Sequence, residues 1–212
     1  MRMINLAFLI ILSMVIPSPV SAESGEDPRW LISLKSGQGE MLTESWDTTY
    51  SKKTDFNGIE AGWKYSRQFG INVGVSHSSS SGKAKTLSGR VSNDVLRTQL
   101  MVVDISFVFR LAFFKNQIVV PYAATGYSQT FYRIDINGNE IIGDQNGYHL
   151  KGGLLFLLDS IEPERADEMK TRFLVGNTYL FAEYYQSKVD DFGSGVNDLG
   201  SKCIAGGLVF EF

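Results

Sequence analysis

Residues 98–113 read Thr-Gln-Leu-Met-Val-Val-Asp-Ile-Ser-Phe-Val-Phe-Arg-Leu-Ala-Phe, and this stretch decides the fold. Every odd position from 101 to 113 is apolar, whereas the even positions include Asp104, Ser106 and Arg110. Successive side chains of a strand point to opposite faces, so one face is apolar and the other carries both signs of charge. Such a strand does not suit the core of a sandwich. The pattern is typical of a strand with lipid on one side and a polar barrel interior on the other.

Other segments repeat this alternation with less contrast. They are residues 29–38, 56–66, 70–79, 118–133, 147–158, 177–188 and 204–212. The two faces of 118–133 are too similar to assign. Together with 98–113 these segments make an even number of strands, each near the ~9–11 residues that cross a bilayer at a tilt. The sequence therefore predicts an all-β fold, an eight-stranded antiparallel transmembrane β-barrel, with a ten-stranded count left open.

The connections between these segments alternate in length. Long polar ones are expected at 39–54, 80–95, 135–146 and 188–199, and short ones at 66–69 and 114–117. With both termini of the chain in the periplasm, the long connections become extracellular loops and the short ones periplasmic turns. The agreement between loop length and strand order supports the topology independently of the strand count.

One periplasmic connection, about 159–171, is predicted to contain a short helix. Pro163 suits the first helical turn, and acidic residues gather near the start. Ile161, Ala166 and Met169 would form a small apolar stripe on the barrel rim or the membrane interface. A solvated helical turn is the alternative interpretation of so short a stripe.

The first 22 residues have the composition of a secretory signal peptide. Arg2 supplies the basic region, residues 6–16 are apolar, and Val20-Ser21-Ala22 is a small-residue cleavage site. The apolar run is shorter than the about 20 residues that a spanning helix needs, which disfavours a retained anchor. Residues 23–212 would then form one barrel domain. A net charge of −3 argues against nucleic acid as a partner.

Several motifs carry a family resemblance, and together they span most of residues 23–212. They are Trp30-x-Ile32-x-x-Lys35-x-Gly37, Pro121-Tyr122-x-x-x-Gly126, Leu157-Leu158-Asp159 with Glu162-Pro163-Glu164-Arg165-Ala166, Asn177-Thr178-Tyr179-Leu180-Phe181-Ala182-Glu183-Tyr184, and Glu211-Phe212. On these motifs the chain resembles a family of small outer-membrane β-barrel proteins of unassigned function, named from a myxobacterial genome and broadly similar to OmpA and OmpW. The resemblance implies the bacterial outer membrane, with its lipid and lipopolysaccharide as surroundings, and brings no catalytic residues or cofactor.

The last strand also resembles the C-terminal signal that the barrel-assembly machinery reads. Apolar or small residues share one face at Gly206, Leu208, Phe210 and Phe212, and Glu211 lies on the other. Spacing alone establishes only an amphipathic strand. The assembly machinery is therefore an expected partner through the resemblance.

The presumed interior face collects charges of both signs. They are Lys35, Glu60, Lys64, Asp104, Arg110, Lys151, Glu183 and Glu211. An eight-stranded barrel has room for side chains alone, so these groups are expected to fill the lumen as ion pairs. Glu183 with Arg110 or Lys151 is the first pair expected. A gated path for ions or small solutes is the alternative.

A catalytic interpretation rests on His77 and Ser79, two apart on one strand face, as base and nucleophile of a lipid A-modifying enzyme. The run of four serines from Ser78 makes such a pair almost automatic, and the sequence identifies no orienting acid. His149 is expected in the polar interior, and Cys203, the single cysteine, as an inward packing residue. The two histidines and the cysteine show no metal-ligand spacing, so no metal or cofactor is expected.

The sequence thus predicts a non-enzymatic outer-membrane barrel that serves membrane integrity or surface contact, with an extracellular partner reached through the loops. A narrow, OmpW-like conduit for small solutes is the alternative. A soluble, lipocalin-like binding barrel is a third possibility, which would require an apolar interior and a polar outside.

Overall fold

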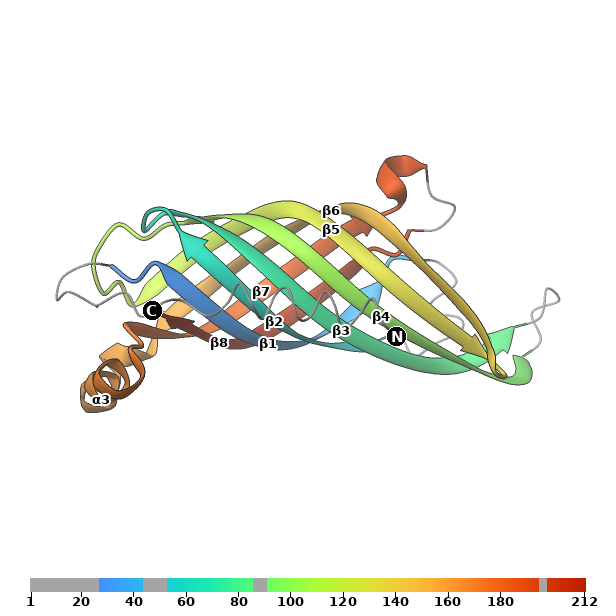
Figure 1. Ribbon diagram of the computed structural model, residues 1–212, viewed down its shortest axis with the longest axis horizontal. Coiled ribbons are helices and arrows are strands. Elements are labelled where there is room, and N and C mark those ends of the chain that lie inside the picture. Colours follow the sequence, from blue (N-terminus) through green and yellow to red (C-terminus); the bar gives the residue numbers. More distant parts are fainter. Residues whose placement is uncertain (1–26, 44–52, 86–90, 195–197) are drawn as a thin grey trace.

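The computed structural model describes residues 27–43, 53–85, 91–194 and 198–212. In it, eight strands pair in chain order and the last pairs with the first, which closes an antiparallel barrel (Figure 1). The predicted fold class is confirmed, and the barrel has eight strands, not ten. The signal peptide predicted at residues 1–22 lies outside the described residues.

Each predicted strand has a counterpart in the barrel. The strands are β1 (Trp30–Met41), β2 (Thr54–Lys64), β3 (Phe69–Lys85), β4 (Val91–Arg110), β5 (Val119–Ile136), β6 (Asn139–Leu157), β7 (Asn177–Val189) and β8 (Ser201–Glu211). The helical segments are the 3₁₀ turns η1 (Leu158–Ser160) and η2 (Asp191–Gly193) and the helix α3 (Pro163–Phe173).

The wall of the barrel is apolar outside and charged inside. The exposed fraction is 40–71% for outward apolar residues of seven strands, namely Leu34, Ile59, Ile71, Ile105, Phe107, Leu150, Leu154, Leu180 and Ile204. Inside, Lys151 is 2% exposed, while Asp104 and Glu211 are 1% exposed. This arrangement is the reverse of a soluble protein and of a lipocalin-like barrel. It is stable where lipid is the outer solvent.

The two ends of the barrel differ. At one end, called the α3 end, lie the start of β1, the end of β8, the turns at 65–68 and 111–118, and α3 (Figure 1). Aromatic side chains gather outside the wall there: Trp30 is paired opposite Trp63, and the Phe69 ring lies 5.2 Å from that of Phe109. Such aromatic rings are typical of a membrane–water interface. The opposite end is called the hairpin end.

At the hairpin end, the prediction of long loops at 80–95 and 135–146 is wrong for the described residues, because strands occupy 80–85, 91–95 and all of 135–146 except two residues. β3, β4, β5 and β6 have 17, 20, 18 and 19 residues, against 11–13 for the other four strands. β5 and β6 are joined only by Asn137 and Gly138, whose φ angles are 52° and 87°. Positive φ at both residues is what a type I′ hairpin turn requires, and Asn-Gly is its preferred sequence. The polar composition of these segments favours loops in a sequence-based prediction, but the segments form strands that continue the sheet.

These four strands continue as a sheet beyond their shorter neighbours, and we call this part the hairpin extension (79–85, 91–99, 129–136 and 139–146) (Figure 1). β2 pairs with β3 only as far as Ser78, and β7 pairs with β6 only from Gly147. The barrel therefore closes over part of its length, and one side of its wall rises past the closed part.

The helix predicted at 159–171 is present but later and interrupted. Asp159 lies in η1, where it accepts a hydrogen bond from the Thr178 backbone and burial raises its pKa, and α3 then begins at Pro163. No residue of α3 is buried, and the apolar groups exposed around it are Ile161, Phe173 and Leu174. In the described part of the chain, no helix has the length and apolarity to cross a bilayer.

Candidate functional site

The lumen near the α3 end holds a three-residue ion cluster from β2, β4 and β8. The two carboxylate oxygens of Glu211 lie 2.7 Å from Lys64 Nζ and 2.7 Å from Arg110 Nη1. Asn177 Nδ2 donates a further hydrogen bond to Glu211 at 3.0 Å. One carboxylate thus joins two cations across the barrel, which satisfies charges that would be costly if buried alone.

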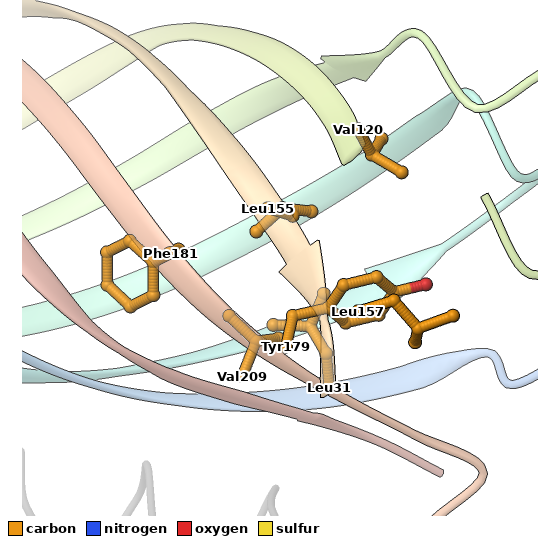
Figure 2. Packing of buried hydrophobic residues seen from close by; sticks show 7 residues of the cluster. All are labelled: Leu31, Val120, Leu155, Leu157, Tyr179, Phe181 and Val209. Carbon is orange, nitrogen blue, oxygen red and sulfur yellow. The ribbon is translucent and has the colours of Figure 1, made fainter. Parts of the chain in front are cut away.

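An apolar cluster lies inside the barrel beside this ion cluster. Figure 2 shows its residues, Leu31, Val120, Leu155, Leu157, Tyr179, Phe181 and Val209. They come from β1, β5, β6, β7 and β8. This cluster differs from the interior predicted from the sequence, which is polar and contains no apolar cluster. The sequence feature that indicates this cluster is the presence of apolar residues on both faces of a strand near its end. In β6, for example, the inward Leu157 follows the outward Phe156.

The middle of the lumen holds a second ion cluster. Lys151 Nζ lies 2.7 Å from Glu60 Oε2 and 2.7 Å from Asp104 Oδ1, and Lys35 Nζ lies 3.7 Å from the same Glu60 oxygen. The four residues belong to β1, β2, β4 and β6. The two contacts of Lys151 span the barrel and join β6 to β2 and β4, which are not its neighbours in the sheet.

Glu183 does not form the ion pairs that were expected first. Arg110 contacts Glu211, and Lys151 contacts Glu60 and Asp104, as described above. Glu183 instead accepts a hydrogen bond from Tyr122 Oη at 2.7 Å. Alternation places a residue on a face but does not specify which partner it reaches across a lumen.

His149 is fully buried in the lumen. Its Nε2 lies 2.9 Å from Ser106 Oγ, its Nδ1 lies 2.7 Å from Ser128 Oγ, and its ring stacks on Tyr185 with the centroids 5.6 Å apart. Both ring nitrogens are thus occupied by hydroxyl groups, which gives the histidine a packing role in the wall. In the described residues no three His, Cys, Asp or Glu side chains are grouped as metal ligands would be.

Glycines make room for the large lumen side chains. Six inward glycines lie directly opposite a large inward residue of the neighbouring strand; the pairs are Gly58–Lys35, Gly62–Asn72, Gly74–Asp104, Gly143–Tyr132, Gly153–Tyr122 and Gly207–Phe181. A Cβ atom at Gly74 would lie 3.0 Å from Asp104 Oδ2, and one at Gly153 would lie 2.9 Å from a ring carbon of Tyr122. Each large side chain therefore lies over the bare backbone of its partner.

Within the part of the barrel that the structure describes, two lumen cavities each have a volume of about 30 Å³. That volume holds a water molecule or two but no organic solute. One is lined by Arg110 and part of the apolar cluster, the other by Tyr185 and Cys203, and Lys35 and Glu183 line both. These two side chains therefore border both cavities.

The other sequence candidates lie apart from this network. His77 and Ser79 are both exposed on the outer wall of β3, where His77 is paired opposite Asn57 and Met101. Cys203 is buried and faces the second cavity. Of the residues expected to form the assembly signal, Phe212 completes the seam between β8 and β1, because its N–H donates to the Trp30 carbonyl at 2.8 Å.

The hairpin extension presents polar and apolar groups together. Arg133 forms an ion pair with Glu140, and Gln129 Nε2 donates to Asp144 Oδ2 at 3.0 Å. Beside these groups, Ile141 is 51% exposed and Ile142 is 71% exposed. Polar residues at this level of the wall indicate that the extension stands outside the hydrocarbon layer.

Comparison with known proteins agrees with this geometry. The model of a family described as "Outer membrane protein beta-barrel domain" matches residues 8–204. Among solved structures, Neisserial surface protein A has 14% identity and a TM-score of 0.58, with 86% of this chain and 97% of that chain covered. OprG from Pseudomonas aeruginosa has 10% identity and a TM-score of 0.53, with 88% and 97% covered. No curated protein matches the sequence.

A further similar structure is Ail, the attachment invasion locus protein of Yersinia pestis, in complex with the heparin analogue sucrose octasulfate. It has 16% identity and a TM-score of 0.52, with 87% of this chain and 100% of that chain covered. At such identities the likeness establishes the fold. The fold and its apolar wall define a small transmembrane barrel of the bacterial outer membrane. By the match over most of its length, the chain belongs to the outer-membrane β-barrel domain family.

Proposed function

We propose that the protein is a non-catalytic surface protein whose hairpin extension projects outside the cell and makes contacts there, while the lumen stays closed. The carrying observation is the difference in strand length, since 17–20 residues in β3 to β6 stand beside 11–13 in the other strands. The about 9–11 residues that cross a bilayer leave the excess in water. A sheet is a rigid support for a contact surface.

The filled lumen supports the closed state. Two ion clusters and the apolar cluster lie inside the wall, and the cavities between them hold only a few water molecules. We place the α3 end in the periplasm and the hairpin end outside, with residues 1–22 as the export signal and Gly206, Leu208, Phe210 and Phe212 as the signal for the assembly machinery. Lipopolysaccharide would then surround the base of the extension.

The charge of the extension bears on the partner. Arg97 and Arg133 stand there with Asp135, Glu140 and Asp144, so the described side chains give no excess of positive charge. The heparin analogue held by Ail is a polyanion. We therefore propose that this chain contacts a polypeptide, not a sulfated sugar.

The test uses a trimmed barrel that keeps its register. Thr130 is paired opposite Gln145, so residues 131–144 can be replaced by Asn-Gly to give a shorter hairpin with the same turn type. A non-adherent bacterial strain that produces the full chain is expected to attach to immobilised extracellular-matrix proteins, and the trimmed chain is expected to lose this. Heat-dependent gel mobility verifies that both barrels fold. Equal attachment by both, with ion conductance by the full chain, would instead favour the conduit.

A further inference from the structure

β6 has a free edge in the hairpin extension. It pairs with β5 from Asn139, opposite Ile136, but pairs with β7 only from Gly147, opposite Val189. Residues 139–146 therefore have a strand on one side, and no described strand on the other. A free edge presents unpaired N–H and C=O groups and is a template for another strand.

The turn fixes which groups point outward. In a two-residue hairpin the pair next to the turn, here Ile136 and Asn139, exchanges its backbone hydrogen bonds, so the odd residues of β6 bond to β5. The even residues point away, and Asn146 demonstrates this, because its N–H donates outward to Asp191 Oδ1 at 2.8 Å. Glu140, Ile142 and Asp144 therefore direct their N–H and C=O groups to the free side.

The side chains around this edge leave it accessible. Ile142 is 71% exposed, and Glu140 and Asp144 are exposed on either side of it. Natural edges are commonly blunted by lysine, proline or a bulge. Residues 139–146 contain neither lysine nor proline, and their continuous register with β5 shows that they contain no bulge.

The charges select the occupant. Side chains directly opposite each other in a sheet interact, and like charges there are unfavourable. A second copy of this edge, paired about Ile142, would put Glu140 opposite Asp144 twice. A strand with lysine or arginine opposite each carboxylate and an apolar residue opposite Ile142 would instead form favourable pairs at all three positions.

We propose that the β6 edge at residues 140–144 binds an extended polypeptide segment as an added strand, with a basic–apolar–basic alternation in that segment. This rests on the proposed function, since it names the kind of partner that the extension contacts. Backbone hydrogen bonds supply the attachment, and Glu140, Ile142 and Asp144 supply the preference.

The test measures binding of a fluorescein-labelled, end-blocked peptide containing Lys-Thr-Val-Thr-Lys to the full chain in nanodiscs, by fluorescence polarisation. Ile142→Pro removes the outward N–H at a position where proline does not break the bonds to β5. Ile142→Ala keeps both backbone groups. The expected result is at least about tenfold weaker binding for Ile142→Pro than for Ile142→Ala. A peptide with Glu in place of both Lys is expected to bind more weakly to the unmodified chain.

Equal binding by the unmodified chain and Ile142→Pro would overturn the inference, as would equal binding of both peptides. Cross-linked dimers that Ile142→Pro abolishes, without peptide binding, would assign the edge to a second copy and also overturn it. Should cell attachment be lost in the trimmed chain but kept in Ile142→Pro, the proposed function stands and this inference fails.

Discussion

Gly74 faces the lumen directly opposite Asp104, and Gly153 stands in the same way opposite Tyr122. At the scale of single residues, the interior is therefore built from pairs of very unequal size. Protein interiors are close-packed, so an atom added to the small partner has to displace the large one. The ion clusters depend on this space as much as on charge.

The pair at Gly74 gives a direct prediction. Gly74→Val adds a Cβ that would lie 3.0 Å from Asp104 Oδ2, and it moves the carboxylate from Lys151. The expected cost in the free energy of unfolding in micelles is about 1–3 kcal/mol, measured by urea titration. Gly152→Val is the matched control, because Gly152 points outward and a Cβ there has nothing within 4 Å. Equal effects of the two changes would contradict the packing argument.

Lys151 is the cation that joins the two carboxylates of the second ion cluster. Lys151→Met leaves Glu60 and Asp104 buried without the cation that contacts both. Removing one partner of a buried ion pair costs about 3–5 kcal/mol, and that loss is expected in the same urea titration. Lys188→Met, which removes an exposed pair with Asp190, is the control and is expected to have no measurable effect. Full stability of Lys151→Met would refute a structural role for the cluster.

At the scale of elements, α3 and the barrel wall contribute unequally to the fold. α3 packs lightly against η1 and the start of β7, and none of its side chains is buried. The wall instead holds long antiparallel ladders on both sides of every strand in the closed part. The helix is therefore an attachment to the barrel and not a support for it.

Removing the helix tests this view. Replacement of residues 161–173 by a short Gly-Ser linker, with Asp159 and Val175 kept, is expected to change the free energy of unfolding by less than about 1 kcal/mol. The measurement is urea unfolding of the purified barrel, with the shift in gel mobility on boiling as the check of folding. Loss of that shift would show that the helix is needed for the barrel to form.

Strand positions were accessible from sequence because alternation is a local property. Asp104 and Arg110 occupy even positions between odd-numbered apolar residues, which was sufficient to assign the faces of β4. The structure places both side chains inside the barrel. Contacts across the lumen were not accessible. Glu183 is joined to Tyr122, and His149 to two serines, by the curvature and register of strands far apart in the sequence. The Asn137-Gly138 pair is a recognisable signal for a hairpin turn, but the polar residues near it favoured the prediction of a long loop.

At the scale of the whole molecule, the barrel is a membrane wall with a closed interior. Lys35 and Glu183 border both lumen cavities, so they are the side chains whose removal would join the two. An interior that is filled by side chains conducts little, and its permeability depends on a few of them. Conductance is therefore a property of the whole barrel that single residues control.

Planar-bilayer recordings test this. The unmodified barrel is expected to be silent, and the double variant Lys35→Ala with Glu183→Ala is expected to show small, stable conductance steps because the two cavities merge. Ser36→Ala, at an exposed outward position of β1, is the control and is expected to remain silent. Conductance in the unmodified barrel would favour the narrow conduit, whereas silence in the double variant would mean that the remaining ion pairs and the apolar cluster suffice to seal the lumen.

The pairing of each large lumen residue with a glycine has a consequence for how the family evolves. The nearest atoms to a Cβ added at Gly74 all belong to Asp104, so a larger residue at 74 would be accepted only after 104 becomes small. The same exchange is expected at 62 and 72 and at 143 and 132, where the side chain opposite is the nearest group to an added Cβ. Among homologues, these positions should vary together in volume, even where neither is invariant. Paired changes in side-chain volume at these positions would thus be detectable even among homologues whose functions differ.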